Sequence, residues 1–380
     1  MFTPATGYRM QIAANTTGML AGLAVVADAD AVEHCVVVIK GTFVTDHRGE
    51  LRLSQLQQPL TTTDEHYGEP GSSCMRYECD FALWKPYTDV LVVGNAVAPN
   101  GQSVAKLAVQ LQVQGRAKDL LVYGERHWRS TLLGVEASAP APFTQMPITF
   151  DRAWGGQDNS QGEDRVAVEP RNPVGVGFHP HRHRAEVNGL PLPNIEAPGQ
   201  SITSPRERYE PAGYGCIGRS WQPRVALAGT YGDRWRQERA PYLPADFDPR
   251  YFQCAPQDQQ FPHFQGGEKI RCVHMAEDAV VEYIIPSRSV PVSFRFSDAE
   301  VDRQAVLDTV IVEPNQLRAL LVWRASVPLR KKLTALAEIL VGEPPQTAAV
   351  FPVGHRHGKP VFARLSEAVR WLRQQRQGRV

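Results

Sequence analysis

The chain has 380 residues, with 41 Lys and Arg against 40 Asp and Glu, which gives a formal net charge of +1. This balance excludes a general electrostatic attraction to nucleic acid or to an anionic membrane surface. Hydrophobic residues at 42% and charged residues at 21% are ordinary for a globular protein, and this length fits one large domain or two smaller ones.

The first hundred or so residues predict strands. Residues 35–44 (CVVVIKGTFV) are rich in β-branched side chains and predict a buried strand, which a turn at 46–49 joins to a hairpin partner. Further strands are predicted at 74–83 and 89–97. Between 107 and 114 Leu and Val alternate with Ala and Gln, which predicts a strand with one buried and one solvated face. We therefore expect residues 33–135 to form an antiparallel β-sandwich or barrel-like sheet.

Residues 147–259 differ from this scaffold. They are dense in Gly, Pro, aromatics, Arg and Asp, and they lack a long stretch of helical or strand periodicity. A disordered linker would be poor in aromatics, so we expect long ordered loops. Trp, Tyr and Arg dominate interface hot spots, and ordered loops on a β scaffold commonly carry function. The residues predicted to bind a partner are Trp154, Phe178, Trp221, Tyr231 and Trp235. The alternative is that such side chains form a core and a polar network that hold the loops in shape.

The C-terminal third predicts two hairpins and two helices. The hairpins are expected at 277–285 with 290–296, and at 306–312 with 317–323. A helix is expected over 329–341, with Leu333, Leu336, Ile339 and Leu340 on one face, and a last helix capped by Ser366. The domain organisation is then a β-rich domain over 1–300, with its loop-rich centre at 147–259, and C-terminal strands and helices over 301–380 packed on the same domain.

Three histidines suggest a metal site. His179, His181 and His183 alternate in HPHRH, so on a strand they would share one face, and Glu163, Asp164 and Glu169 could add oxygen ligands. Pro180 interrupts the run and Arg182 and Arg184 add positive charge, so a solvent-exposed basic loop is the favoured interpretation. The metal site is kept as an alternative.

Other catalytic signatures are missing from the sequence. There is no GxSxG motif, and Ser220 and Cys216 sit in glycine-rich turns without a nearby histidine. The glycines of 175–178 and 213–218 neither follow a clear strand nor open a clear helix, so they predict turns rather than nucleotide loops. We therefore expect a protein that is not an enzyme and has no cofactor.

The six cysteines are dispersed without CxxC spacing, which is typical of a reduced, intracellular protein. The first 20 residues show no basic region followed by an apolar run, so we expect no signal peptide. The apolar runs are too short for a membrane span. We expect a cytoplasmic location, with no membrane insertion and no nucleic-acid partner.

A series of motifs resembles the bacterial family catalogued as domain of unknown function 2169. They are KPYTDVLVVG (85–94), GERHW (124–128), PITFDRAWGG (147–156), RNPVGVGF (171–178), LPNIE (192–196), PAGYG with SWQPR (211–224), AGTYGDRW (228–235) and APYLPADFDPRYFQCAPQDQ (240–259). The likeness covers roughly residues 10–300. One departure is Gly232, where the family's GTY motif is followed by an acidic residue, a role that Asp233 can take.

The resemblance implies an adaptor of type VI secretion. Such a protein holds an effector in the cytoplasm, through its PAAR-type tip domain or the adjacent region, and promotes its loading on the VgrG spike. The second hypothesis is a metal-dependent hydrolase that uses His179, His181 and His183, and a third is a carbohydrate-binding β module.

Overall fold

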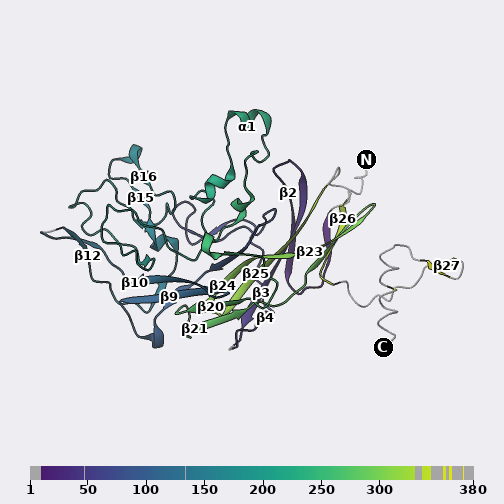
Figure 1. The fold of residues 1–380 in the computed structure, drawn as a ribbon, viewed down its shortest axis with the longest axis horizontal. Helices are drawn as coiled ribbons and strands as arrows, with labels where there is room; N and C mark the ends of the chain where they lie inside the picture. The colour runs from purple at the N-terminus through teal and green to yellow at the C-terminus, as the bar shows by residue number, and fades with distance from the viewer. Residues whose placement is uncertain are drawn as a thin grey trace, which may run out of the picture.

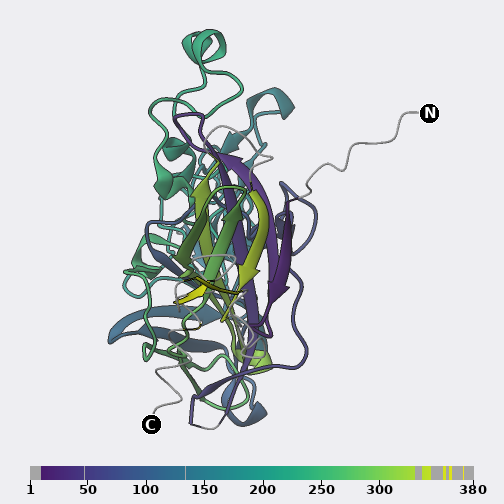
Figure 2. The ribbon, with the colours of Figure 1, turned by 90° about the vertical axis from the view of Figure 1, so that its right-hand side faces the viewer.

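A computed structural model describes residues 10–46, 48–132, 134–329, 336–343, 354–356, 359–361 and 371. The fold is mainly β, as predicted, and its strands gather in three larger sheets with loops around them (Figures 1 and 2). Of the C-terminal helix expected to begin near residue 366, the structure describes Trp371 alone, which is helical; the rest of this prediction lies outside the described residues.

The largest sheet has seven strands in the order β19-β7-β24-β25-β3-β2, with β4 also paired to β3. Its strands are β2 (Leu20–Ala27), β3 (Glu33–Thr45), β4 (Leu51–Leu53), β7 (Thr88–Val92), β19 (Gln260–Phe261), β24 (Val306–Glu313) and β25 (Arg318–Pro328). The predicted β3–β4 and β24–β25 hairpins are confirmed. β24 runs parallel to β7, so segments from both ends of the chain form the middle of one sheet.

Two further sheets complete the scaffold. The five-stranded sheet contains β18 (Ile195–Glu196), β10 (Arg116–Tyr123), β9 (Lys106–Val113), β20 (Lys269–Val273) and β21 (Val280–Ile284), in that order. The four-stranded sheet contains β1 (Gln11–Asn15), β26 (Leu336–Val341), β22 (Pro291–Phe296) and β23 (Glu300–Gln304). The alternation predicted for 107–113 is confirmed, because the four Leu and Val side chains of β9 are buried and its others are exposed or half-buried.

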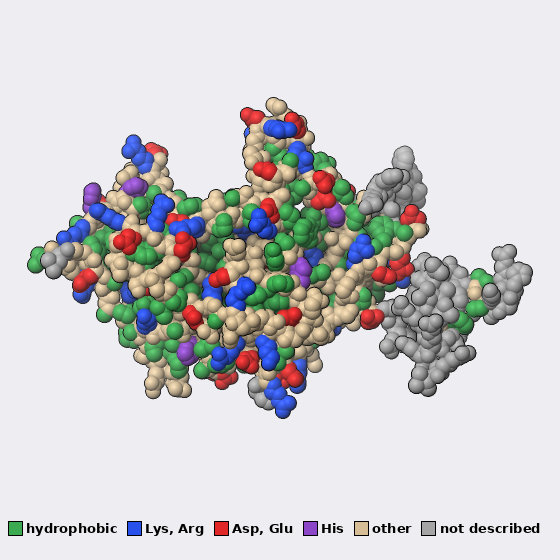
Figure 3. Space-filling view, viewed as in Figure 1, with side chains coloured by type: hydrophobic (Ala, Val, Ile, Leu, Met, Phe, Trp, Pro, Cys, Tyr) green, Lys and Arg blue, Asp and Glu red, His purple; other side chains and the backbone are tan. Residues whose placement is uncertain are grey.

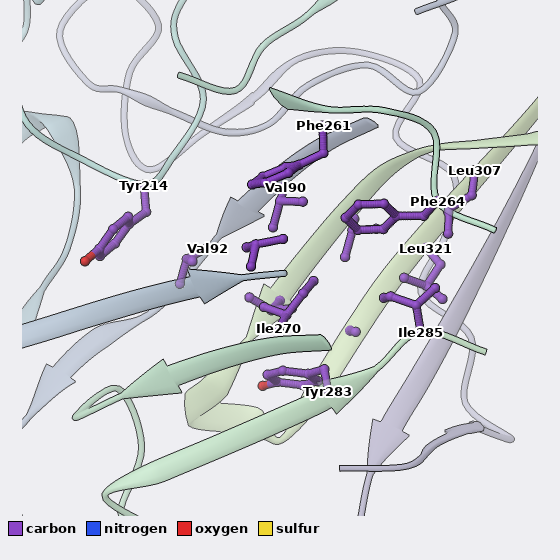
Figure 4. Packing of buried hydrophobic residues seen from close by; sticks show 14 of the residues in the cluster. Val90, Val92, Tyr214, Phe261, Phe264, Ile270, Tyr283, Ile285, Leu307 and Leu321 are labelled. Atoms are coloured by element: carbon purple, nitrogen blue, oxygen red, sulfur yellow. The ribbon is translucent and has the colours of Figure 1, made fainter. Parts of the chain in front are cut away.

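The main core lies between these sheets. Figure 4 shows Val90, Val92 and Leu321 of the seven-stranded sheet facing Ile270 and Tyr283 of the five-stranded sheet. Val292 and Ile339 bring the four-stranded sheet into the same cluster. Alternate side chains of each strand enter this core, as the pleat requires.

The other face of the seven-stranded sheet is covered by loops. Leu91, Ile311 and Leu320 pack there against Cys216 and Cys254 of the loop-rich centre. A separate cluster combines Trp128 with five residues of the centre, Trp154, Phe178, Val187, Leu192 and Ile202. The centre is therefore an ordered structure with its own cores, as the aromatic content predicted.

The remaining elements are short. The paired strands are β5 (Glu65–His66) with β6 (Met75–Tyr77), β8 (Asn95–Val97) with β13 (Gln145–Pro147), β11 (Trp128–Ser130) with β12 (Val135–Ala137), β14 (Trp154–Gly155) with β17 (Val176–Gly177), β15 (Gln157–Asp158) with β16 (Ala167–Val168), and β27 (Gly354–Arg356) with β28 (Lys359–Val361). The helical elements are α1 (Asp233–Glu238) and the 3₁₀ turns η1 (Pro99–Gly101), η2 (Phe150–Arg152), η3 (Glu163–Arg165), η4 (Arg224–Ala228), η5 (Pro249–Phe252), η6 (Gln257–Gln259) and η7 (Pro314–Gln316).

Three expectations are corrected. The segment 33–135 does not form one large sheet by itself, because strands from residues 260–328 complete both of the larger sheets that it enters. Residues 277–285 and 290–296 do not pair as a hairpin; β21 and β22 lie in different sheets. The helix expected over 329–341 is wrong over 336–341, where β26 pairs with β1 and β22. Leu336, Ile339 and Val341 are all buried, and packing between two strands overrides helical spacing. Leu333 lies outside the described residues.

The strand expected over 89–97 is divided between β7 and β8. The side chain of Asn315 enters the break, where its Oδ1 accepts a hydrogen bond of 2.7 Å from the Asn95 amide. A Cβ on Gly94 would lie 2.6 Å from the same oxygen, so glycine leaves the space for this contact.

The packing between the sheets predicts a large energetic difference between two leucines. Leu111 on β9 is buried in the main core, whereas Leu56 is exposed. We expect Leu111→Ala to lower the free energy of unfolding by about 2–5 kcal/mol, and Leu56→Ala to change it by less than about 0.5 kcal/mol. Urea unfolding followed by tryptophan fluorescence measures both. Equal effects of the two substitutions would contradict the packing described here.

Candidate functional site

The loop-rich centre is fixed to the scaffold by Asp89, a fully buried carboxylate on β7. Its Oδ1 accepts hydrogen bonds from the Gln253 side chain at 2.6 Å and the Ala255 amide at 3.2 Å. Its Oδ2 accepts from Lys85 Nζ at 2.8 Å and from the Cys254 amide at 3.0 Å. A buried carboxylate must replace its lost hydration with donors of this kind. Asp89 therefore holds one loop segment on the central sheet.

Glu78 forms a second buried centre. It pairs with the Arg224 guanidinium and, at 3.1 Å, with Arg219. Arg224 also donates to the carbonyl oxygens of Tyr251 at 2.7 Å and Ile217 at 2.8 Å. One guanidinium thus ties together two loop segments that have no ladder between them, using the fixed fork of donors that arginine offers.

The cations of this network are held in their charged form. Burial alone would lower the pKa of Lys85, but Asp89, with Cys254 and Glu78, raises it above its ordinary value. Burial would also lower the pKa of Arg219, but Glu78 and Asp64 raise it above its ordinary value. Lys85 and Arg219 therefore keep their positive charges throughout the physiological pH range.

An arm, residues 229–247, projects from this fixed base and stands clear of the body in both ribbon views (Figures 1 and 2). Asp246 closes its foot by accepting hydrogen bonds from the Thr230 amide at 2.9 Å and hydroxyl at 2.8 Å. Gly229 begins the arm with a φ of 82°, and a Cβ there would come within 2.8 Å of Asp246 Oδ1 and Pro244 Cβ. A glycine is required at this point for both reasons.

The helix α1 forms the tip of the arm. Two exposed ion pairs run along it, Asp233 with Arg236 at 2.7 Å and Arg234 with Glu238 at 2.9 Å, and such pairs contribute little stability. Arg239 then folds back, because it donates to the Leu243 carbonyl at 2.9 Å and also to a carbonyl of the β2–β3 turn. The arm is therefore braced against the neighbouring hairpin.

Aromatic side chains line the arm. Tyr231 and Trp235 meet edge to face with ring centroids 4.7 Å apart, and Trp235 Nε1 donates to the Tyr242 carbonyl at 2.7 Å. The Tyr231 side chain is nevertheless 51% exposed and Tyr242 is 44% exposed. These rings are held in place and face solvent at the same time, a combination that lowers the entropic cost of binding.

Two aromatic side chains of the body, Trp84 and Tyr87, are also exposed, and the Tyr87 amide donates to the Gln253 side chain at 3.0 Å, six residues beyond the end of the arm. Arg250, three residues beyond the end of the arm, has its pKa raised mainly by its bond to Asp248 and further by Tyr87. Figure 3 shows hydrophobic side chains grouped around the foot of the arm. We call the following set the aromatic patch: Trp84, Tyr87, Tyr231, Trp235 and Tyr242.

The five residues predicted to bind a partner fall into two groups in the structure: three are buried and two lie on the arm. Trp154 and Phe178 are buried and pack edge to face at 5.8 Å, and Trp221 is buried against Phe150. With exposures of 6% or less, these three side chains are core residues, which corrects the expectation that they lie on a binding surface. Tyr231 and Trp235 lie together on the arm, and their role remains a prediction.

Trp84, Tyr87 and Tyr242 did not figure among the predicted residues. A signal was available in the segment WKPY, where Lys85 and Pro86 interrupt the strand pattern between two aromatics. Lys85 points inward to Asp89, which leaves Trp84 and Tyr87 exposed on either side.

The three histidines do not come together. His179 is buried, whereas His181 and His183 are exposed. The amides of these last two residues are bound by Asp158 and Glu186 respectively. Among the described residues there is no group of three or more His, Cys, Asp or Glu side chains placed to hold a metal ion. The described part of the chain also has no helix of the length and apolarity needed to cross a membrane.

Comparison with known proteins identifies the family. The model of a family described as an uncharacterized protein conserved in bacteria, DUF2169, matches residues 30–324, and the chain belongs to this family. No curated protein and no solved structure matches the chain.

The Asp89 network predicts a strong effect of a single isosteric change. We expect Asp89→Asn to lower the free energy of unfolding by about 3–5 kcal/mol, because it leaves buried Lys85 without its closest counter-charge. The exposed Asp119→Asn should change it by less than about 1 kcal/mol. Urea unfolding measures both, and limited proteolysis should show faster cleavage within 216–256 in Asp89→Asn only. Unchanged cleavage there would contradict the anchoring role.

The burial of His179 predicts a pH dependence. Burial, and then the Arg182 cation, lower the pKa of His179, and Asp158 opposes them only in part. Below the unfolded value of about 6.5, the unfolded chain gains a proton that the folded chain does not, so the free energy of unfolding falls as the pH drops from 7 to 5. His179→Phe should reduce this fall, whereas His181→Phe at the exposed position should not. An equal slope for His179→Phe and the unmodified protein would show that His179 is not the titrating group.

Proposed function

We propose that this DUF2169 protein is a non-enzymatic adaptor of type VI secretion. It holds an effector in the cytoplasm, through a PAAR-type domain or the adjacent region, and promotes its loading on the VgrG spike. The resemblance in the sequence motifs suggests this role, and the aromatic patch on the arm is the structural observation that supports it best.

The patch has the composition of a protein-binding surface. Tyrosine and tryptophan carry much of the binding energy in protein interfaces, because each buries a large area with few rotatable bonds. Three of the five patch residues are on the arm, and the other two are on the body, where the Tyr87 amide bonds to Gln253 shortly after the arm ends. A client chain can therefore contact the arm and the body together.

The arm is suited to binding because it is braced at three points. Asp246 closes the foot, Arg239 contacts the β2–β3 turn, and Trp235 bridges the two sides of the arm. A surface fixed before the client arrives loses less conformational entropy on binding. Apolar segments of an effector that would aggregate in the cytoplasm are covered while they are bound.

The patch is small, and this suits a transient complex. An adaptor must release its client when the spike offers a larger complementary surface, and interfaces of limited area are typical of transient contacts. The exposed ion pairs on α1 keep the tip of the arm polar.

Co-purification from the native bacterium with this protein tagged, followed by mass spectrometry, tests the proposal. We expect to recover an effector with a PAAR-type domain, and we expect that effector to be less abundant when this protein is deleted. Recovery of the tagged protein without any such partner would count against the adaptor role.

The patch predicts which substitutions weaken recovery. Tyr231→Ala combined with Tyr242→Ala should reduce effector recovery by about tenfold or more, because both are exposed tyrosines, a residue type enriched among interface hot spots. Leu132→Ala is the control, since this fully exposed side chain lies in the β11–β12 hairpin, far from the arm in Figure 1. Unchanged recovery with the double variant would show that the client binds elsewhere.

A further inference from the structure

The strand β2 (Leu20–Ala27) lies at one edge of the seven-stranded sheet and pairs only with β3 among the described strands. Its register runs from Leu20 opposite Lys40 to Ala27 opposite Glu33, without a bulge. An edge strand presents unpaired N–H and C=O groups to any extended chain that reaches it.

The register shows which groups of β2 are free. β2 and β4 pair with the same side of β3, and β25 pairs with the other side. The Thr42 amide and carbonyl of β3 bond to Gln57 and Ser54, on the β4 side. The Glu33 carbonyl instead accepts a hydrogen bond from the Leu329 amide, on the β25 side. Even-numbered residues of β3 therefore point toward β2. Their partners in the ladder are Leu20, Gly22, Ala24 and Val26.

The intervening residues of β2 then point their backbone groups away from the sheet, because hydrogen-bonded and non-bonded pairs alternate in an antiparallel ladder. These residues are Ala21, Leu23 and Val25. No hydrogen bond from a described residue reaches their outward N–H or C=O groups. The free edge thus offers three evenly spaced donor–acceptor pairs.

This edge lacks the usual protection against pairing. Natural edge strands are blunted by charged residues, proline or bulges, and LAGLAVVA has none of them. The side chains of Ala21 and Leu23 are only half-buried at the margin of the main core, as is Ile12 of β1, which lies at the edge of the four-stranded sheet. A tight turn, in which the Asn15 side chain donates to the Met19 carbonyl at 2.7 Å, joins the two edges.

An added strand would therefore gain both hydrogen bonds and apolar contact. Its backbone would bond to Ala21, Leu23 and Val25, and its inward side chains would cover the half-buried margin of the core. Beyond Ala27, the side chains of Asp30 and Glu33 are exposed at the hairpin tip, so a basic residue just past the apolar stretch would be complemented.

We infer that the free edge of β2 binds an extended, uncharged segment of the client protein by strand addition. This inference rests on the proposed adaptor function. The client is the expected partner of this edge because Arg239 of the arm contacts the Ala29 carbonyl in the β2–β3 turn. When a client is bound on the aromatic patch, the adjacent part of its chain therefore lies beside β2. Main-chain pairing supplies affinity for segments of varied sequence, which suits an effector carrier.

Amide hydrogen exchange, followed by NMR on the full chain with and without the effector recovered by co-purification, tests the inference. In the protein alone, the amides of Ala21, Leu23 and Val25 should exchange fast while those of Gly22, Ala24 and Val26 are protected. In the complex, the first three should slow by about tenfold or more. This alternation distinguishes strand addition from a general loss of solvent access.

A matched pair of variants adds a binding test. Val25 has its amide on the free side, so Val25→Pro removes a donor for the client without removing a bond to β3. We expect Val25→Pro to weaken effector binding by roughly tenfold, and Val25→Ala, which keeps the amide, to change it by less than about threefold. Because the exchange measurement uses the unmodified chain, it decides the question even if Val25→Pro does not fold.

The other outcomes are distinct. An effector that binds while all three outward amides still exchange fast would overturn this inference and leave the adaptor function standing. Slow exchange of these three amides in the protein alone would overturn the inference too. If that protection increases with protein concentration, a second copy of the chain occupies the edge; if it does not, another segment of the same chain does. A protein that binds no effector would overturn both proposals.

Discussion

The buried carboxylate of Asp89 is the interaction on which the rest of the structure depends. Asp89 lies on β7 in the seven-stranded sheet. Its hydrogen-bond donors are Lys85, which comes just before β7, and Gln253 and Cys254, which lie in a loop more than 160 residues further along the chain. A buried charge without such donors would cost several kcal/mol, so the loop has one favourable position. Through Glu78 and Arg224, the same constraint extends to the segments on either side of the arm.

This arrangement explains how a long segment without regular structure can carry a defined surface. The loops cannot satisfy their backbone groups with a ladder, so side chains and turns perform that task. Asn172 is an example, since its buried amide donates to the carbonyls of Phe150 at 2.8 Å and Trp154 at 3.0 Å. The arm starts from this fixed base, and the proposed binding surface is ordered before any partner is present.

The free edge of β2 and the arm have a common origin in the sheet topology. Placing β24 and β25 between β7 and β3 moves β2 to the outside, and near that edge one face of the sheet is covered by Leu60, Phe81 and Leu83 together with Phe252 of the loop-rich centre. The arm then reaches the β2–β3 turn. If both surfaces bind the same client, the arm contacts it through aromatic side chains and β2 binds it through main-chain hydrogen bonds. The side-chain contacts then supply affinity, and the main-chain bonds allow clients of varied sequence to bind.

The sequence by itself determined the features that depend on neighbours along the chain. Alternation identified β9, β-branched residues identified β3, and a Glu-Pro-Asn turn identified the β24–β25 hairpin, because each pattern records which side chains of one local element are buried. The aromatic content also indicated that residues 147–259 are ordered. Only the tertiary structure decided which aromatics are exposed. Trp154 and Trp235 occur in similar glycine- and arginine-rich surroundings, yet Phe178 and Tyr209 cover the first, whereas the second stands on the arm. The tertiary structure also made 336–341 a strand and left one edge of β2 unpaired, because pairing between distant segments is set by the whole fold and leaves no local periodicity in the sequence.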